Sequence, residues 1–362
     1  MKLISHNKPL LNNEELKAFE KVVKSGWIIE GDEVRKFENN LSKRICFKYA
    51  KAVSSGTAAL HLSLLALGLG EGDEVIVPSY TVGDVLNAIN YTQAKPIVVD
   101  IAPNSFNLDT QSVKKKITKK TKAIIVPHMF GKAAKIDSLL KFKIPIINDS
   151  AQSLGTIYKG SPVERFGDLT VLSFFATKIL ATGQGGMVLT NNKKYFEFIS
   201  DIINYNGRDI YKIRFNYPMT DLIASIGNSQ LAKLDQFLKL RKQIGKKYQK
   251  ALENSNIIFF PDSNDCDSNY FRFILKFESE QERKKAQKIF SQNFINTIIP
   301  LKDYELLHNC LKLNKKNYNN SEDIARKTLS IPLYPALKKS EIERIVKVLK
   351  NLSTLRTNPS TG

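Results

Sequence analysis

Hydrophobic residues between about Lys51 and Asn192 come in short runs separated by longer amphipathic stretches. The runs are rich in Val and Ile and span residues 74–80, 95–101, 122–128, 144–150, 168–174 and 185–191. Short apolar runs of this kind are typical of strands buried on both faces, and helix-length spacers between them indicate βαβ units. The pattern therefore predicts an α/β fold built on a mainly parallel sheet.

The pattern changes after residue 235. The expected elements are a charged helix over 234–255, a strand over 270–277, a helix over 280–293 and a C-terminal helix that ends near residue 352. In the last helix, Ile342, Ile345 and Leu349 share one face. We therefore expect a large domain over residues 1–235, including an N-terminal segment, a smaller α+β domain over residues 236–352 and a disordered tail over residues 353–362.

Composition and charge add little to this picture. The chain has 42% hydrophobic and 25% charged residues, as ordinary soluble globular proteins do. Its formal charge of +20 indicates either attraction to a polyanion or a lysine-rich composition spread over solvated faces. Lysines occur in every region without a recognisable nucleic-acid-binding motif, which favours the second interpretation. We expect neither nucleic acid nor a membrane as a partner.

The cysteines and the apolar segments predict a cytoplasmic protein. Cys46, Cys266 and Cys310 are widely spaced and odd in number, so they predict neither a disulfide framework nor a metal site. The longest apolar run, over residues 58–70, contains two polar residues and is too short to span a bilayer. The first residues show no secretory signal.

Small and hydroxyl residues precede the apolar helical run that ends at Gly68. Gly56 and Thr57 would place free backbone N–H groups at a helix N-terminus, which is a ready site for an anion. An ordinary helix cap has the same local sequence. This segment is a candidate phosphate site only in combination with others.

A carboxylate and an amide follow the strand predicted over 144–150. Asp149 ends this strand, and Gln152 comes three residues later. Open α/β sheets bind their ligands at the carboxyl ends of parallel strands. A turn-forming Asp that caps the next element is the alternative.

One lysine stands alone in the apolar and small-residue run from Ser173 to Leu189. Lys178 is the only cation in this run, and "TGQGG" follows it. Apolar surroundings lower the pKa of a lysine amine, which prepares it for Schiff-base chemistry. The alternative is a lysine at a half-buried strand end whose amine reaches solvent.

A fourth segment, over residues 214–235, joins two polar residues to a helix. Asn216 and Tyr217 precede a helical face that carries Leu222, Ile226 and Leu231. Taken alone, this segment is a capped helix.

Together, the candidate segments match the needs of pyridoxal 5'-phosphate (PLP). Its phosphate needs a helix N-terminus, its pyridine nitrogen a carboxylate and its aldehyde a lysine. The chain supplies these groups in the order of Gly56, Asp149 and Lys178. We therefore predict PLP as the cofactor, with Lys178 and Asp149 as the catalytic residues.

The chain resembles the DegT/DnrJ/StrS family of PLP-dependent sugar aminotransferases. The resemblance rests on "SGWIIEGDEVRKFE", "AVSSGTAALHLSLLALGLGEGDEVIVPSYT", "KTKAIIVPHMFG", "NDSAQSLGTIYKG" and "FNYPMTDLIASIGNSQLAKLD", in this order, and extends to "IPLYPALKKSEIERIVKVL". It implies the fold of the type I PLP-dependent transferases: a large domain with a mainly parallel seven-stranded sheet flanked by helices, and a smaller C-terminal α+β domain.

The resemblance also implies roles for individual residues. Lys178 would form the Schiff base with the cofactor. Asp149 would pair with the protonated pyridine nitrogen, which would lower the pKa of its carboxyl. Gln152 would lie near the ring hydroxyl. Gly56, Thr57 and Ser173 would hold the phosphate, and Asn216 would reach the cofactor of a neighbouring subunit, which implies a homodimer with shared active sites.

Several positions depart from the family pattern. Val82 stands where the family has an aromatic residue stacked on the cofactor ring, so that the partner is absent or is another residue such as Tyr80. Gln184 replaces the usual Glu. Phe215 and Pro218 replace a Tyr and an Arg, which predicts a different contact with the substrate.

The activity that the resemblance implies is transfer of an amino group from an amino acid, L-glutamate, to a nucleotide-diphosphate-linked ketosugar. Such a reaction would serve the biosynthesis of aminosugars and cell-surface glycans. Two alternatives stay open: a member of the family that acts on a non-sugar ring ketone, and a non-catalytic regulatory or nucleic-acid-binding protein that keeps the fold. Lys178 argues against dehydratases of the family, which carry His at this position.

Overall fold

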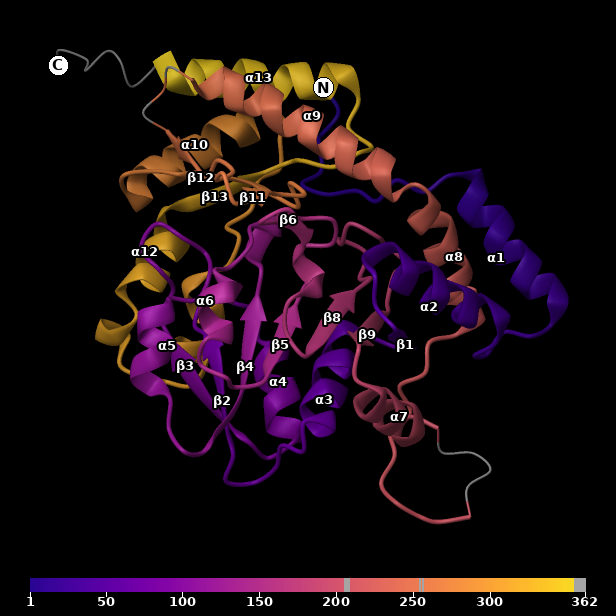
Figure 1. Cartoon of the computed structure of the whole chain (residues 1–362). Helices are drawn as coiled ribbons and strands as arrows, with labels where there is room; N and C mark the ends of the chain where they lie inside the picture. The colour runs from indigo at the N-terminus through magenta and orange to yellow at the C-terminus, as the bar shows by residue number, and fades with distance from the viewer. Residues whose placement is uncertain (205–208, 254, 256, 355–362) are drawn as a thin grey trace.

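A seven-stranded sheet forms the centre of the molecule (Figure 1). The computed structural model describes residues 1–204, 209–253, 255 and 257–354. The strands are β1 (Tyr49–Val53), β2 (Glu74–Pro78), β3 (Lys95–Val99), β4 (Thr121–Pro127), β5 (Ile146–Asp149), β8 (Leu169–Ser173) and β9 (Gly186–Thr190). They lie in the order β1-β9-β8-β5-β4-β2-β3. The pairs from β8 to β3 are parallel, whereas β9 is antiparallel to both of its neighbours.

Helices cover both faces of this sheet, because its strands are apolar on both sides. On β2, the buried side chains of Val75 and Val77 point to one face and that of Ile76 to the other. The first face packs against α3 (Gly56–Ala66), α4 (Asp84–Tyr91) and α7 (Lys193–Ile202). The second packs against α2 (Asp32–Ile45), α5 (Thr110–Lys116), α6 (Ile136–Leu140) and α8 (Asp221–Ala232), and α1 (Asn13–Ser25) packs on α8.

The C-terminal part has its own apolar core around a small antiparallel sheet. This sheet has the order β10 (Ile258–Phe259), β12 (Phe273–Lys276) and β13 (Thr328–Ile331). Three helices enclose it: α9 (Leu234–Leu252), α10 (Glu280–Gln292) and α13 (Lys339–Thr354). In Figure 1, α9 and α13 lie side by side across one end of the molecule. Ile4 belongs to this core and forms a β-bridge with Ile295.

Short elements join the two parts. They are the sheet β11 (Cys266–Asp267), β6 (Ile157–Tyr158) and β7 (Ser161–Pro162), the helices α11 (Leu307–Cys310) and α12 (Asn319–Lys327), and the 3₁₀ turns η1 (Met129–Gly131), η2 (Val163–Arg165), η3 (Asp303–Glu305) and η4 (Lys315–Asn317). Between α11 and α12, the Tyr318 hydroxyl donates to the Val98 carbonyl at 3.2 Å. Residues that the sequence assigns to the small domain therefore also touch the edge of the large sheet.

The structure confirms the α/β class and the mainly parallel sheet. All six runs predicted as strands belong to the seven-stranded sheet; β1 was missed because Lys51 interrupts its short apolar sequence. The domain division at residue 235 stays a prediction. The predicted disordered tail lies outside the described residues from residue 355 onward, while residues 353 and 354 still belong to α13. Across the described residues, no helix has the length and apolarity needed to cross a membrane.

Candidate active site

A cavity of about 490 Å³ opens at the carboxyl ends of β5 and β8. Six of the seven residues predicted to bind the cofactor line it: Gly56, Thr57, Asp149, Gln152, Ser173 and Lys178. The seventh, Asn216, does not line it and is exposed on the surface of the chain. The main-chain N–H of Ser54 donates to the carbonyl of Tyr217, so Asn216 lies in a segment that runs beside the start of α3.

The N-terminus of α3 forms one wall of the cavity. Ser55 caps the helix in an extended conformation, and its hydroxyl accepts from the N–H of Ala58 at 3.0 Å. The first N–H groups of a helix have no partner within the helix and attract anions. A Cβ on Gly56 would lie 2.9 Å from the Cβ of Ser173, so glycine lets β8 bring the Ser173 hydroxyl up to this turn. The wall fits a phosphate group.

Lys178 lies on the turn that follows β8. Its N–H donates to the carbonyl of Phe175 at 2.8 Å, which directs the side chain into the cavity. Burial, with a smaller contribution from the charge of Arg272, lowers the pKa of the Lys178 amine to about 8, although the charge of Asp149 opposes the change. The amine is therefore neutral in a substantial fraction of molecules just above neutral pH.

Asp149 ends β5 and points its carboxylate into the cavity. Among the described residues, the Ala151 N–H donates to this carboxylate at 3.1 Å. Burial raises the pKa of Asp149 above its ordinary value, and the Ala151 N–H and the charge of Lys178 oppose this rise. A buried carboxylate with so few donors fits a cationic partner such as a protonated pyridine nitrogen. The lowering of its pKa by that partner stays a prediction.

Gln152 is held by hydrogen bonds at both ends. Its side-chain Oε1 accepts from the N–H of Phe130 at 2.9 Å, and its main-chain carbonyl accepts from the side-chain amide of Asn269 at 2.9 Å. Phe130 has a φ of 58°, a left-handed conformation that turns its N–H toward Gln152. The side-chain amide nitrogen of Gln152 is thereby oriented by the protein in the wall of the cavity.

Val82 lines the cavity, but Tyr80 does not. Tyr80 is fully buried in the core, where its ring packs against Phe106 and Phe130. The suggestion that Tyr80 replaces the stacking residue is therefore wrong, because its ring lies in the core and does not line the cavity. Phe175 and Phe271 are the aromatic residues among those that line the cavity.

The other departures from the family pattern have different surroundings. Gln184 lines the cavity, so the cavity lacks the negative charge that a Glu at this position would contribute. Phe215 instead stacks on Tyr217 and packs edge-on against His61. Pro218 forms a β-bridge with Val53. Phe215 and Pro218 therefore contact other parts of the protein and do not line the cavity.

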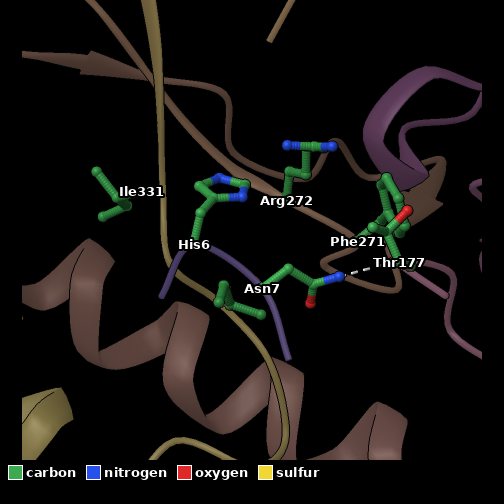
Figure 2. A pocket seen from close by; sticks show the side chains of 7 residues that line it. His6, Asn7, Thr177, Phe271, Arg272 and Ile331 are labelled. Carbon is green, nitrogen blue, oxygen red and sulfur yellow. Dashed lines mark hydrogen bonds between the residues drawn. The ribbon is translucent and has the colours of Figure 1, made fainter. Parts of the chain in front are cut away.

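Asp84, Phe271 and Arg272 are among the cavity residues that the sequence analysis missed. Asp84 opens α4, and the other two precede β12 in the C-terminal part. Arg272 lies between His6 and Phe271 in Figure 2, where the first residues of the chain come close to the cavity. A signal was present, because Arg272 is a lone cation within the apolar run 270–275, as Lys178 is within its own run.

The donor set of the cavity thus fits PLP. The α3 N-terminus and Ser173 match its phosphate, Asp149 its pyridine nitrogen and Lys178 its aldehyde. These residues come from four separate elements, so the fit depends on the fold and not on one motif.

The comparison with known families decides the identity of the chain. The profile of the DegT/DnrJ/EryC1/StrS aminotransferase family matches residues 9–350. The chain belongs to this family. It is a PLP-dependent aminotransferase, and the catalytic role of Lys178 stays a prediction.

Relatives of the aminotransferase include enzymes of sugar metabolism. It is 32% identical to GDP-perosamine synthase of Escherichia coli O157:H7, over 94% of this chain and 96% of the other. It is 28% identical to the spore coat polysaccharide biosynthesis protein SpsC of Bacillus subtilis, over 96% and 97% of the two chains.

Solved structures extend the likeness to the whole fold. Spr1654 of Streptococcus pneumoniae in its PLP form superposes with a TM-score of 0.91 and 26% identity, over 98% of this chain and 99% of the other. DesV of S. venezuelae superposes with a TM-score of 0.89 and 26% identity, over 96% and 99%. The aminotransferase therefore has the fold of a PLP-dependent sugar aminotransferase, and its family supports a role in aminosugar biosynthesis by transamination.

Proposed function

We propose that the aminotransferase moves the amino group of L-glutamate to the keto group of a nucleotide-diphosphate-linked sugar, for aminosugar and cell-surface glycan biosynthesis. The observation that carries this proposal is the cavity that unites a phosphate site, a buried carboxylate and a lysine of lowered pKa. The likeness to GDP-perosamine synthase supports the sugar substrate. The excess of cations over anions in the chain suits a substrate that carries a diphosphate.

Lys178, Asp149, Ser173 and the α3 N-terminus each have a role in this scheme. Bound PLP would supply an electron sink next to the carbon that loses its proton. Lys178 would hold the cofactor and then, once freed, take the proton from the donor's Cα as a neutral amine. General acid–base catalysis of this kind contributes about 100- to 10,000-fold. Asp149 would keep the pyridine nitrogen protonated, and Ser173 with the α3 N-terminus would fix the phosphate.

The absorption spectrum of the purified protein with PLP tests the first half of the reaction. We expect a Schiff-base band that L-glutamate bleaches in the wild type and that is absent from Lys178→Ala. A panel of GDP-, UDP- and dTDP-linked ketosugars, followed by mass spectrometry, then tests the second half. A band that L-glutamate and other amino donors leave unchanged would contradict transamination, and amination of a non-sugar ring ketone in preference to every ketosugar would contradict the sugar substrate.

We further propose that two copies of the chain share their active sites through Asn216. This residue is exposed in the single chain and lies outside the cavity, although its segment runs beside the start of α3. Mixed dimers of Lys178→Ala and Asn216→Ala subunits would then contain one intact site and regain turnover that neither parent dimer has. Light scattering of the wild type measures the dimer independently, and a monomer would contradict this part of the proposal.

We place the reaction in the cytoplasm. The three cysteines are free thiols in the described part of the chain, which suits a reducing compartment. Cell fractionation with an antibody against the native protein tests this placement, and recovery outside the cytoplasmic fraction would contradict it.

A further inference from the structure

A second cavity, of about 330 Å³, is separate from the active-site cavity: of the described residues that line it, none lines the other. It opens where the C-terminal end of α2 and residues 154–164 meet α9 and β11. Its apolar side chains are those of Ile45, Leu154, Ile157, Pro162, Leu234 and Leu238. A cavity of this volume and lining can hold a small molecule with an apolar body.

Four of the charged side chains in this lining neutralise one another in pairs. Arg44 of α2 forms an ion pair with Asp235 of α9, and Lys242 of α9 forms one with Asp267 of β11 at 2.6 Å. Glu164 also lines the cavity, but it is completely buried, and no cation of the described residues forms an ion pair with it. The lining therefore contains one buried carboxyl without a counterion.

Glu164 is fixed in η2 with only half of its carboxyl satisfied. Its Oε1 accepts from the N–H of Gly155 at 2.7 Å, and its main-chain carbonyl accepts from the Thr170 hydroxyl at 2.6 Å. Its Oε2 is buried and has no hydrogen-bond partner among the described residues. Burial raises the pKa of the Glu164 carboxyl to about 7, although the N–H groups of Glu164 itself and of Gly155 oppose the rise. A buried carboxylate without a partner is costly, so a cationic donor at Oε2 would stabilise it.

Asn269 forms part of the wall between the two cavities. Its side-chain amide donates to the main-chain carbonyls of Gln152 and Leu154 at 2.9 Å and 3.0 Å, and its Oδ1 accepts from the N–H of Phe271 at 2.9 Å. Gln152 and Phe271 line the active-site cavity, whereas Leu154 and Asn269 line the second cavity. An occupant of the second cavity would therefore lie beside the active site without entering it.

We propose that the second cavity binds a small organic ammonium ion with an apolar body, and that Oε2 of Glu164 accepts the N–H of its amine. The apolar lining removes the body of such a ligand from water, and the ammonium supplies the charge and the donor that Glu164 lacks. A neutral apolar molecule would leave Oε2 unsatisfied, and this carboxylate would repel an anion. The site does not depend on the amino transfer proposed above, because the described residues of its lining lie outside the active-site cavity.

Three benzyl compounds separate charge from hydrogen bonding in the wild-type holoenzyme. Benzyldimethylamine is a cation with an N–H at the pH of the experiment, benzyltrimethylammonium is a cation without an N–H, and benzyl alcohol is a neutral donor. None of them can form a Schiff base with PLP, so calorimetry measures binding alone. We expect benzyldimethylamine to bind most tightly, and crystals soaked with it should show its nitrogen beside Oε2 of Glu164. Equal binding of the three compounds, or density for the amine only at another place, would overturn the proposal.

The variant Glu164→Gln removes the charge and keeps a side-chain acceptor for the N–H of Gly155. In this variant the Kd of benzyldimethylamine should rise about 10- to 150-fold, the effect of one hydrogen bond to a charged group. Glu71→Gln, at an exposed position between α3 and β2, is the matched control and should bind the amine as the wild type does. An unchanged Kd in Glu164→Gln would show that the carboxyl does not hold the amine.

The pH dependence of binding tests the same carboxyl in the wild type. With a pKa of about 7, the ionised fraction of Glu164 rises from about a tenth at pH 6 to about nine-tenths at pH 8, where the ligand amine stays largely protonated. The Kd of benzyldimethylamine should therefore fall about tenfold over this range. Glu164→Gln keeps the other charged groups of the lining and should lose this dependence; these groups are Arg44, Asp235, Lys239, Lys242 and Asp267. The same pH dependence in both proteins, or none in the wild type, would contradict the proposal.

Discussion

Asn148 and Asp149 are neighbours on β5, yet their surroundings are opposite. The Asn148 amide donates to the carbonyls of Val163 and Phe166, both at 2.7 Å, and its oxygen accepts from His128 at 3.0 Å and from Ser150 at 2.7 Å. The carboxylate of Asp149, on the other side of the strand, accepts from one N–H of the described chain and faces the cavity.

The difference shows how the protein separates structural from functional polar groups. The cluster around Asn148 is complete, because the Nδ1 of His128 accepts from the N–H of Ala134 and its Nε2 is left to donate to Asn148. Such a network stabilises one arrangement of the core. The groups of the cavity keep unused hydrogen-bonding capacity, which only a ligand can satisfy. Asp149, Lys178 and Arg272 share this property although they come from different parts of the chain.

The largest effect should come from removing the cavity lysine. Lys178→Ala should lower turnover by more than about 10,000-fold, because both the covalent attachment and the proton transfer are lost. Steady-state kinetics with a ketosugar substrate measures this. Lys132, which is ion-paired with Asp262 outside the cavity, provides the matched change: Lys132→Ala should keep its turnover. Residual activity of Lys178→Ala within 100-fold of wild type would contradict the role of its amine.

The neighbouring strand residues should show opposite defects. Asn148→Ala leaves a histidine, a serine and two carbonyls without their partner, which should cost about 4 kcal/mol of unfolding free energy. Asp149→Asn should change this free energy by less than about 1 kcal/mol, since few contacts depend on its charge. Urea unfolding measures both variants. Equal losses of stability would show that the two sides of β5 do not differ as described.

A smaller effect concerns the pH dependence of stability. The pKa of Lys178 is about 8 in the folded protein against 10.5 for the ordinary side chain, so between these values the unfolded chain binds more protons. Stability therefore rises with pH, by about 2 to 3 kcal/mol between pH 7 and pH 10. The cofactor-free wild type should gain this amount relative to Lys178→Met. The exposed Lys17→Met gives the baseline, and a pH-independent difference for Lys178→Met would refute the burial of its charge.

The smallest effect is the contribution of His128 to the pH dependence of stability; this residue belongs to the hydrogen-bonded cluster around Asn148. Burial lowers the pKa of His128 to about 4 from 6.5, so the unfolded chain binds more protons as the pH falls below 6.5. The wild type should lose about 2 kcal/mol between pH 7 and pH 5 relative to His128→Gln, which cannot titrate. Urea unfolding at the two pH values measures this loss. If the difference does not change, the imidazole is not held neutral by its partners.

Much of the fold could be predicted because the strands carry their own signal. The runs that became β2, β3, β4, β5, β8 and β9 are rich in Val and Ile, and burial on both faces leaves no polar alternation to confuse them. The cavity residues at the ends of these strands were predicted for the same reason: the end of a parallel strand marks the ligand edge of the sheet. Asp149 and Ser173 are such positions.

The remaining residues depend on contacts between distant segments. Arg272 reaches the cavity because the C-terminal part folds over the sheet, and no local pattern places it beside Lys178. Tyr80 follows β2 directly, but its ring packs against Phe106 and Phe130 in the core, and these contacts are not visible in the local sequence. His308 of α11 contacts Ser79 and Glu322 of α12 in a buried cluster, which forms only when these two helices pack beside the end of β2.

The bridge between Ile4 and Ile295 also determines the order in which parts of the chain can fold during its synthesis. A chain leaving the ribosome presents its N-terminus first, but the docking partner of Ile4 is made nearly 300 residues later. The segment that carries His6 and Asn7 must therefore wait, undocked, while the central sheet assembles behind it. The piece synthesised first is placed among the last, and Arg272 loses its access to water from that side when it arrives.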